Sequence, residues 1–231
     1  MKTKIFCDIA NKNLIRKFNK KKIVKGFTTN PSLMRQAGAN DYRKYCKDIL
    51  KICKKPISFE VFADDYKQMR SQALKINEWG KNIYVKIPVV NSKGRFSGKI
   101  IKELSNKKIK LNITAVYTSN QTEKILKCIN KKTKVIISIF AGRAADTGKD
   151  PIPEIVESIK LSKKFKNVEI LWASVREPYN YLQAKQLGCH IITIPPSIIE
   201  KIENFGKSFS YLTIDTVKKF LIDSKSSNFK I

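Results

Sequence analysis

The sequence lacks any long apolar run, and it has a single histidine and few acidic residues. No apolar stretch approaches the roughly 20 residues that a membrane-spanning helix needs, so we expect no membrane association. Residues 1–8 reach charged side chains too soon for the apolar segment of a secretory signal. We therefore expect a cytoplasmic protein.

The cysteines form no pattern that marks a disulfide framework or a metal centre. There are 5 of them, an odd number, and they are spread along the chain without a CxxC pair. Buried, reduced thiols are the economical interpretation. Zinc would need more soft ligands than one histidine and scattered cysteines supply, so we expect no metal and no other cofactor.

Acidic residues are outnumbered by basic ones, with 19 Asp and Glu against 47 Lys and Arg and a net charge of +28. Such an excess attracts polyanions. However, the lysine clusters precede separate predicted strands, and no aromatic residues are interleaved with them for base stacking. We expect a solvated basic surface and no nucleic-acid partner. The clusters are Lys20–Lys22, Lys107–Lys108, Lys131–Lys132 and Lys163–Lys164.

Short β-type runs alternate with helical patterns along the whole chain. The predicted strands are residues 4–8, 23–28, 57–61, 83–87, 110–114, 135–139, 168–173 and 191–194. The predicted helices include residues 42–53, 66–78, 98–104, 121–129, 152–165 and 178–187. This order predicts an α/β protein with a single (β/α)₈ TIM barrel. A doubly wound open sheet is the alternative, but its usual Gly-rich phosphate loop is missing.

We expect one domain over residues 1–231, with a C-terminal helix and tail from about 208 to 231. Local signals support several helix ends. Thr118 and Gln121 fit a capping box, Asp150 precedes a proline in a first helical turn, and Gly188 follows a helix as a stop signal. His190 precedes the last strand, at the end of a barrel that carries stability, so we interpret it as structural.

The predicted strand 83–87 carries a lysine in the middle of an apolar run. Because side chains alternate along a strand, Tyr84 and Lys86 share one face. Burial inside a barrel would lower the pKa of this lysine and make the neutral amine a nucleophile. A lysine on an edge strand that extends to water is the alternative from this segment alone.

Polar residues stand at nearly every predicted strand end, which is where barrel enzymes carry their chemistry. Each one has a structural alternative: Asn30 with Pro31 fits a turn, and Glu60 fits a surface acid. Their coincidence favours a site built around Lys86. A carboxylate-only metal site at Asp8 and Glu60 is disfavoured, because a lysine and an arginine would compete with the cation. The residues are Asp8, Thr28, Thr29, Asn30, Glu60, Lys86, Asn112, Thr114, Ser138, Arg143, Ser174 and Arg176.

Several of these residues lie in motifs that resemble the transaldolase family. Residues 26–33, GFTTNPSL, are similar to its GxTTNPSL signature, and residues 84–88, YVKIP, resemble its Schiff-base strand. Residues 111–114, 138–143 and 173–176 match three further motifs in order and spacing. The resemblance runs from about residue 4 to residue 220 and points to the small-subunit branch, which includes fructose-6-phosphate aldolases.

The resemblance implies a class I aldol mechanism. Lys86 would form an imine with a ketose, and Asp8 would act as the acid and base of carbon–carbon cleavage. Glu60, assisted by Thr114, would activate the water that is used in forming and hydrolysing the imine. The implied ligands of the dihydroxyacetone fragment are Asn30, Asn112 and Ser138. The implied phosphate ligands are Arg143, Ser174 and Arg176, and guanidinium groups suit a phosphate.

Glu60 and Phe140 indicate a transaldolase, since the aldolases of the family tend to carry glutamine and tyrosine there. The expected reaction converts sedoheptulose 7-phosphate and glyceraldehyde 3-phosphate into erythrose 4-phosphate and fructose 6-phosphate, as in the pentose phosphate pathway. Three segments depart from the family pattern: residues 89–94, residues 142–146, which hold a small residue where a larger aliphatic one is common, and residues 208–231. They bear on acceptor preference and subunit packing.

The first hypothesis is therefore a cofactor-free transaldolase acting on sugar phosphates, and we expect a homo-oligomer. A fructose-6-phosphate aldolase, or a relative acting on an unusual sugar in a biosynthetic route, is the alternative within the same fold. An inactive basic barrel that binds nucleic acid is the alternative from another class. The set Asp8, Glu60 and Lys86 argues against the last.

Overall fold

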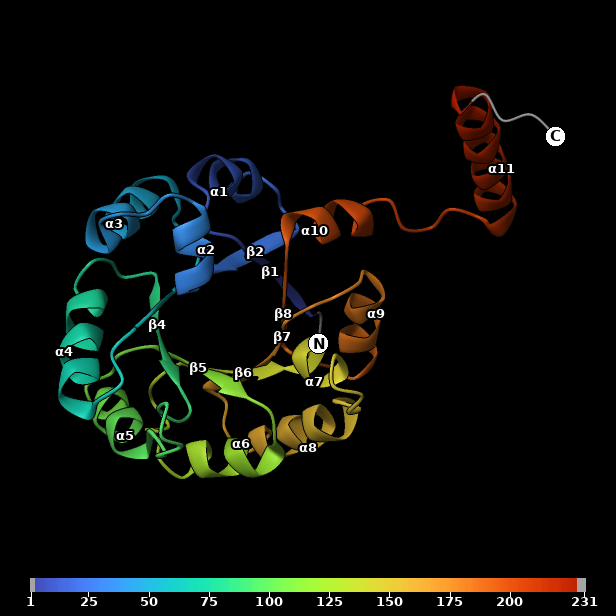
Figure 1. The fold of residues 1–231 in the computed structure, drawn as a ribbon. Coiled ribbons are helices and arrows are strands. Elements are labelled where there is room, and N and C mark those ends of the chain that lie inside the picture. The colour runs from blue at the N-terminus through green and yellow to red at the C-terminus, as the bar shows by residue number, and fades with distance from the viewer. Residues whose placement is uncertain (1–2, 228–231) are drawn as a thin grey trace.

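Residues 3–227 are described by a computed structural model, and they hold eight strands that close into a parallel barrel (Figure 1). Each strand pairs with the next along the chain, and β1 also pairs with β8. The barrel confirms the predicted fold class, and its closure excludes the open sheet. The strands are β1 (Lys4–Asp8), β2 (Val24–Thr28), β3 (Ile57–Glu60), β4 (Ile83–Pro88), β5 (Leu111–Val116), β6 (Val135–Phe140), β7 (Val168–Ala173) and β8 (Ile191–Ile194).

Helices ring the barrel and cover its outer face (Figure 1). The predicted helices are present with ends that differ by up to three residues, and four further helices, α1, α2, α7 and α10, were not predicted. The ranges are α1 (Lys12–Asn19), α2 (Pro31–Gln36), α3 (Tyr42–Ile52), α4 (Tyr66–Asn77), α5 (Gly98–Asn106), α6 (Ser119–Leu126), α7 (Ala141–Ala145), α8 (Ile152–Ser162), α9 (Tyr179–Gln186), α10 (Pro196–Ile202) and α11 (Phe209–Ser226).

Several helix-end signals are confirmed. Thr118 and Gln121 form a capping box at the start of α6, with each side chain bonded to the other residue's backbone. Asp150 was predicted as the N-cap of α8, but the N-cap residue is Pro151, and Asp150 stands one residue earlier, where its carboxylate accepts a hydrogen bond from the Ile152 backbone at 2.9 Å. Gly188 follows α9 with φ of 70°, a conformation that glycine adopts without strain.

His190 lies just before β8, at the amino end of the barrel. The Ile170 backbone N–H donates a hydrogen bond to its Nδ1 at 3.1 Å. Burial lowers the pKa of the ring, which favours the neutral form that can accept this bond. The contact agrees with the structural interpretation of His190.

Apolar side chains fill two separate regions. The larger core lies between the strands and the helices, and a smaller cluster fills the barrel interior. Gly26 makes room inside the barrel, since a Cβ there would lie 2.5 Å from the Phe6 ring. The interior cluster consists of Phe6, Tyr84, Ile136, Leu171, Ala173 and Ile191, with Phe140 packed against it.

The six residues of this interior cluster form an apolar plug in the barrel, and they set the level at which the polar residues lie. Side chains on a strand alternate, so the second residue after each plug residue also faces the interior, nearer the carboxyl end. Those residues are polar on four strands, where they follow Phe6, Tyr84, Ile136 and Ile191. They are Asp8, Lys86, Ser138 and Thr193, and they lie above the plug.

The C-terminal helix α11 projects away from the barrel (Figure 1). None of residues 209–226 is buried, and many of its large apolar side chains are exposed. Over residues 3–227, no helix combines the length and apolarity that crossing a membrane requires. Residues 228–231 of the predicted tail lie outside the described residues. The homo-oligomer stays a prediction.

Candidate active site

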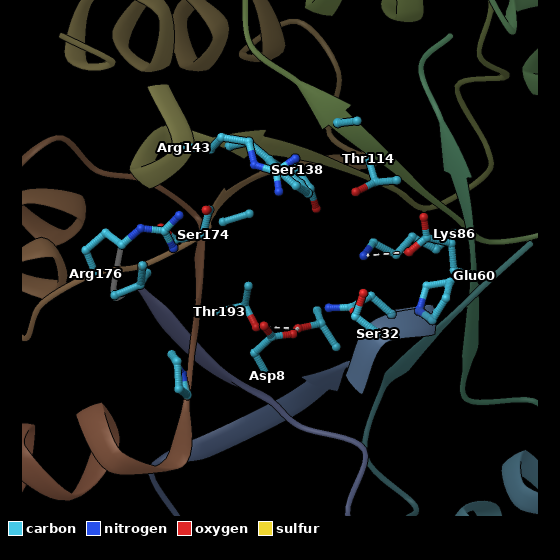
Figure 2. A pocket seen from close by; sticks show the side chains of 18 residues that line it. Asp8, Ser32, Glu60, Lys86, Thr114, Ser138, Arg143, Ser174, Arg176 and Thr193 are labelled. Carbon is cyan, nitrogen blue, oxygen red and sulfur yellow. Dashed lines mark hydrogen bonds and ion pairs between the residues drawn. The ribbon is translucent and has the colours of Figure 1, made fainter. Parts of the chain in front are cut away.

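A cavity of about 510 Å³ opens at the carboxyl end of the barrel (Figure 2). Each strand contributes to its wall, together with the segments that follow β2, β6, β7 and β8. Every residue that the sequence predicts for the site lines this cavity except Thr29 and Asn112. The lining residues are Asp8, Thr28, Asn30, Pro31, Ser32, Glu60, Lys86, Thr114, Ala115, Ser138, Phe140, Arg143, Ala173, Ser174, Val175, Arg176, Thr193 and Pro195.

Lys86 lies inside the barrel and is only 7% exposed. Its Nζ is 3.0 Å from the Glu60 Oε2 and donates a hydrogen bond to the Thr29 carbonyl at 3.2 Å. The β3–β4 register places Glu60 directly opposite Lys86. The alternative of an edge-strand lysine that extends to water is therefore wrong. This amine is the buried one, and it has a carboxylate beside it.

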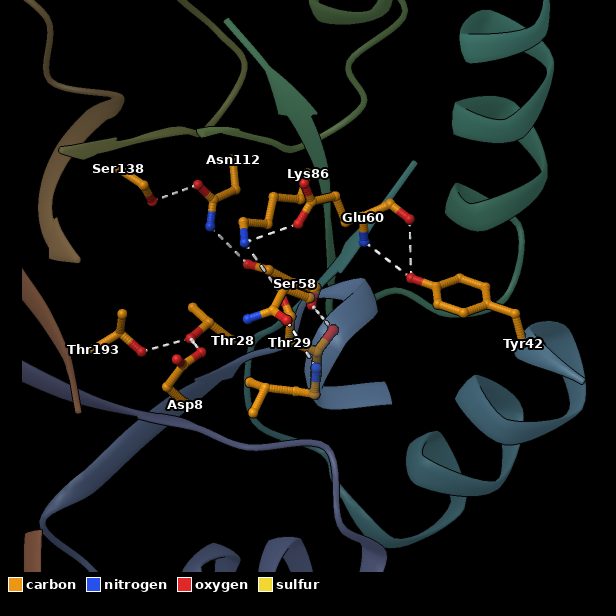
Figure 3. Close-up of polar contacts among 12 residues, drawn as sticks. Asp8, Thr28, Thr29, Tyr42, Ser58, Glu60, Lys86, Asn112, Ser138 and Thr193 are labelled. Carbon is orange, nitrogen blue, oxygen red and sulfur yellow. Dashed lines mark hydrogen bonds and ion pairs between the residues drawn. The ribbon is translucent and has the colours of Figure 1, made fainter. Parts of the chain in front are cut away.

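Tyr42, at the start of α3, holds the end of β3 on which Glu60 stands (Figure 3). Its hydroxyl donates to the Glu60 carbonyl at 2.9 Å and accepts from the Glu60 backbone N–H at 3.1 Å. Burial raises the pKa of this phenol, so it stays neutral and can both donate and accept. The tyrosine thus fixes the backbone that positions the Glu60 carboxylate.

Asp8 faces the cavity from the end of β1 (Figure 2). Its Oδ1 accepts a hydrogen bond from the Thr28 hydroxyl at 2.6 Å. Burial raises the pKa of Asp8, while the Thr28 bond and the Lys86 charge act in the opposite direction. A carboxyl group with a raised pKa can take up and release a proton nearer neutral pH than an ordinary aspartate does.

Asn112 is fully buried and does not line the cavity. Its Nδ2 donates to the Ser58 hydroxyl at 3.0 Å, and its Oδ1 accepts from the Ser138 hydroxyl at 2.7 Å (Figure 3). Both ends of the amide therefore have protein partners, and Asn112 orients Ser138 at the cavity floor. Its direct contact with a substrate stays a prediction.

Thr114 has a buried hydroxyl without a hydrogen-bond partner among residues 3–227. Its neighbour Ala115 has φ of 58°, and the pairing of β5 with β6 shifts register between Ile113 and Val116. A buried hydroxyl without a partner is costly, so it fits a position that contacts water or substrate.

Asn30 caps α2, and its Oδ1 accepts from the Leu33 backbone N–H at 2.9 Å. The pair Asn30 and Pro31 therefore begins a short helix, and the turn alternative is wrong. Because both residues also line the cavity, the cap fixes where the Asn30 amide stands.

Arginines gather at one side of the rim. Arg143 stands on α7 and Arg176 follows β7. The two segments approach so closely that a Cβ on Gly142 would lie 1.6 Å from the Ser174 carbonyl oxygen. Ser174 itself has φ of 65°. Asp146 accepts bonds from the Arg176 Nε at 3.0 Å and Nη2 at 2.5 Å. These bonds and the arginine charge lower the pKa of Asp146.

The predicted residues thus come together, while their catalytic and binding roles stay predictions. Sequence reasoning missed Tyr42, Ser58, Asp146 and Thr193. Ser58 and Thr193 carry a signal that could have found them, because each is a polar residue at an interior position of an apolar strand. Tyr42 and Asp146 carry no such signal, since both stand on helix ends.

The fold and the site define the class of this molecule: a (β/α)₈-barrel enzyme with a buried lysine at its centre. The family described as Transaldolase/Fructose-6-phosphate aldolase matches residues 5–231. The chain belongs to this family and is an aldolase-type enzyme.

Curated relatives agree with this placement. A protein named Probable transaldolase from Methanococcus maripaludis (strain C5 / ATCC BAA-1333) is 34% identical over 221 residues, which cover 95% of this chain and 96% of the relative. A protein of the same name from Thermoanaerobacter sp. (strain X514) is 33% identical over 229 residues, which cover 99% of this chain and 100% of the relative.

Solved structures that resemble the chain share its fold at low identity. KGPDC from Streptococcus mutans has a TM-score of 0.59 and 9% identity, over 87% of this chain and 91% of that chain. Inosine 5' monophosphate dehydrogenase from Legionella pneumophila has a TM-score of 0.58 and 13% identity, over 83% of this chain. The match spans 57% of that longer chain. These likenesses support the barrel alone.

Proposed function

We propose that the protein is a transaldolase that moves a dihydroxyacetone unit between sugar phosphates through a Schiff base on Lys86. The observation that carries the proposal is the buried Lys86 amine, 3.0 Å from the Glu60 carboxylate and facing a cavity that Asp8 also lines. Membership of the family supports it. The proposed donor is sedoheptulose 7-phosphate or fructose 6-phosphate, and the acceptor is an aldose phosphate.

Imine formation needs a neutral amine and the loss of one water. Glu60 would take a proton from the Lys86 ammonium, and the 3.0 Å distance between the two groups supports this step. The amine then attacks the ketose carbonyl carbon to give a carbinolamine. Protonation of its hydroxyl by Glu60 releases water and leaves a protonated imine. The Thr114 hydroxyl would hold that water, which later returns for hydrolysis.

Cleavage of the carbon–carbon bond needs a base on the opposite side. Asp8 takes the proton from the hydroxyl on the carbon that leaves, and that carbon departs as an aldehyde. The bonding electrons pass to the imine nitrogen, which gives a neutral enamine on Lys86. The enamine carbon then attacks an acceptor aldehyde, and Asp8 returns its proton to the new alkoxide.

The rim arginines would hold the substrate phosphate, with Ser174 nearby. Arg143→Ala and Arg176→Ala should each raise the KM for fructose 6-phosphate roughly 10–100-fold, because each removes a charge-assisted contact worth about 1.5–3 kcal/mol. Exchange with unphosphorylated dihydroxyacetone should change much less. Steady-state kinetics with both substrates measures the difference.

A matched control is Arg16→Ala, which removes an exposed arginine of α1. It should leave both reactions unchanged. Equal losses with phosphorylated and unphosphorylated substrates in Arg143→Ala or Arg176→Ala would show that these arginines are structural.

The balance between transfer and release tests the transferase assignment. Phe140 lines the cavity, and its ring offers no hydroxyl to position water against the enamine. Transfer to erythrose 4-phosphate should therefore outpace the release of free dihydroxyacetone. Phe140→Tyr should raise release several-fold. Product partitioning from fructose 6-phosphate, with and without erythrose 4-phosphate, measures both.

If the wild-type protein releases dihydroxyacetone as fast as it transfers it, the transferase assignment is wrong. The fructose-6-phosphate aldolase alternative then takes its place. The imine chemistry on Lys86 is common to both and would be unaffected by that outcome.

A further inference from the structure

Two hydroxyl groups and a carboxyl group, on three neighbouring strands, form a hydrogen-bonded row in the wall of the cavity (Figure 3). Thr193 on β8 and Thr28 on β2 have their Oγ1 atoms 2.5 Å apart, and Thr28 Oγ1 is 2.6 Å from the Asp8 Oδ1. Both threonines are buried, at 5% and 3% exposure. Thr193 is the one polar residue of the β8 sequence IITI.

The direction of these bonds follows from counting hydrogens. A carboxylate only accepts, so when Asp8 is ionised the single Thr28 hydroxyl hydrogen points to Asp8. Thr193 must then be the donor to the Thr28 oxygen. When Asp8 is protonated, its own hydroxyl can donate to Thr28, and the row can reverse. The three groups therefore form one coupled unit.

Hydrogen bonds in series polarise one another, and a bond to an ionised acceptor gains most. The Thr193 bond makes the Thr28 hydroxyl a stronger donor to the Asp8 carboxylate than an isolated hydroxyl would be. Thr193 has no hydrogen bond to Asp8 itself. Its effect is therefore indirect, through the position and polarity of Thr28.

We propose that Thr193 is a positioning residue that acts through Thr28 to hold Asp8 in its ionised form and in line with the cavity. The catalytic consequence rests on the proposed function, in which ionised Asp8 is the base of carbon–carbon cleavage. The hydrogen-bond row itself does not depend on that assignment.

Other charged and titratable groups face Asp8 as well. Lys86 on β4 favours the carboxylate through its positive charge, and Glu60 on β3 partly offsets this charge by pairing with Lys86 at 3.0 Å. Cys7 lies beside Asp8 in the chain but belongs to the outer core, and its thiol pKa is raised. The charged residues of α10, Glu200 and Lys201, are exposed on the far side of β1. These groups are unchanged by a substitution at position 193.

The test is Thr193→Val, which removes the hydroxyl and suits a strand that otherwise holds isoleucines. The pKa of Asp8 should rise by about half a unit, because the charged form loses part of its stabilisation. Thr28→Val, which removes the direct bond, should raise it by about 1–2 units. Thr193→Ser keeps the hydroxyl and should match the wild type. Carboxyl ¹³C NMR of aspartate-labelled protein measures the titration, with Asp8→Asn to assign the signal.

The cleavage activity gives a second readout. The rising limb of the pH profile, which reports ionisation of Asp8, should move to higher pH in Thr193→Val and return in Thr193→Ser. An unchanged Asp8 titration in Thr193→Val, with Thr28→Val shifted, would overturn the proposal. If Thr193→Val does not fold, a comparison of Thr193→Ala with Thr193→Ser decides in the same way.

Failure of this inference and failure of the proposed function give different results. The NMR titration needs no substrate. A raised Asp8 pKa in Thr193→Val therefore supports the role of the hydrogen-bonded row even if the protein forms no adduct with a ketose. Conversely, if the protein transfers dihydroxyacetone but the pKa of Asp8 is the same in Thr193→Val as in the wild type, the proposed function holds and this inference is wrong.

Discussion

Lys86→Arg should fold like the wild type and lose transfer activity completely. A guanidinium stays protonated at all physiological pH values, so it has no neutral nitrogen to attack a carbonyl. It keeps the positive charge that Glu60 faces at 3.0 Å in the wild-type protein. This makes arginine a better choice than an apolar residue, since removing one partner of a buried pair leaves the other charge uncompensated and costs about 3–5 kcal/mol.

Borohydride reduction measures this prediction directly. In the presence of fructose 6-phosphate, the wild-type protein should gain one covalent adduct, which peptide mapping places on Lys86, and Lys86→Arg should gain none. Lys4→Arg is the matched control. Lys4 is also a strand lysine in an ion pair, at 2.7 Å from Glu169, but it stands at the opposite end of the barrel. An adduct on another lysine, or none in folded wild-type protein, would remove Lys86 from its role.

The strands were predictable because their physical signal is strong. The predicted bounds of β1, β7 and β8 are those of the structure, since each is a short apolar run between polar turn residues. The missed α2 and α7 span 6 and 5 residues. Such lengths are too short to show a helical period. Only α2 has a side-chain cap, Asn30, that could have marked it, since α7 has none.

The centre of the site was also predictable from local pattern. A lysine in an apolar strand, with polar residues at the other strand ends, was enough to bring Asp8, Glu60 and Lys86 into one cavity. The backbone at Ala115 and Ser174 was not predictable. Both residues have positive φ, and neither is the glycine that usually marks that conformation.

Partners of side chains were the least predictable feature. A sequence shows that Asn112 and Arg176 are polar, but not which groups they contact after folding. In the structure, both ends of the Asn112 amide form hydrogen bonds with serine hydroxyls, and Arg176 donates hydrogen bonds to Asp146. These contacts join residues far apart in the chain, so no local pattern carries them. They also mean that a substrate phosphate would meet an Arg176 already held by a carboxylate.

Asp8→Asn should still form the imine but cleave the carbon–carbon bond about 10²–10⁴-fold more slowly, the usual contribution of a general acid–base group. Asparagine keeps an oxygen that can accept the Thr28 hydrogen bond, which is 2.6 Å long in the wild type. It cannot take up the substrate proton. Borohydride should therefore trap as much adduct on Lys86 as in the wild type, while the turnover number falls.

The pH dependence separates a lost base from a distorted site. The pKa of Asp8 is raised by burial, so the wild-type rate should climb as pH rises through that value and ionised Asp8 accumulates. Asp8→Asn should lack this rising limb, because no proton leaves position 8. Asp48→Asn, at a partly exposed aspartate of α3 paired with Lys51, should keep both the rate and the limb. Wild-type turnover in Asp8→Asn would show that the proton moves through another group, and Glu60, beside the same amine, would be the next to replace.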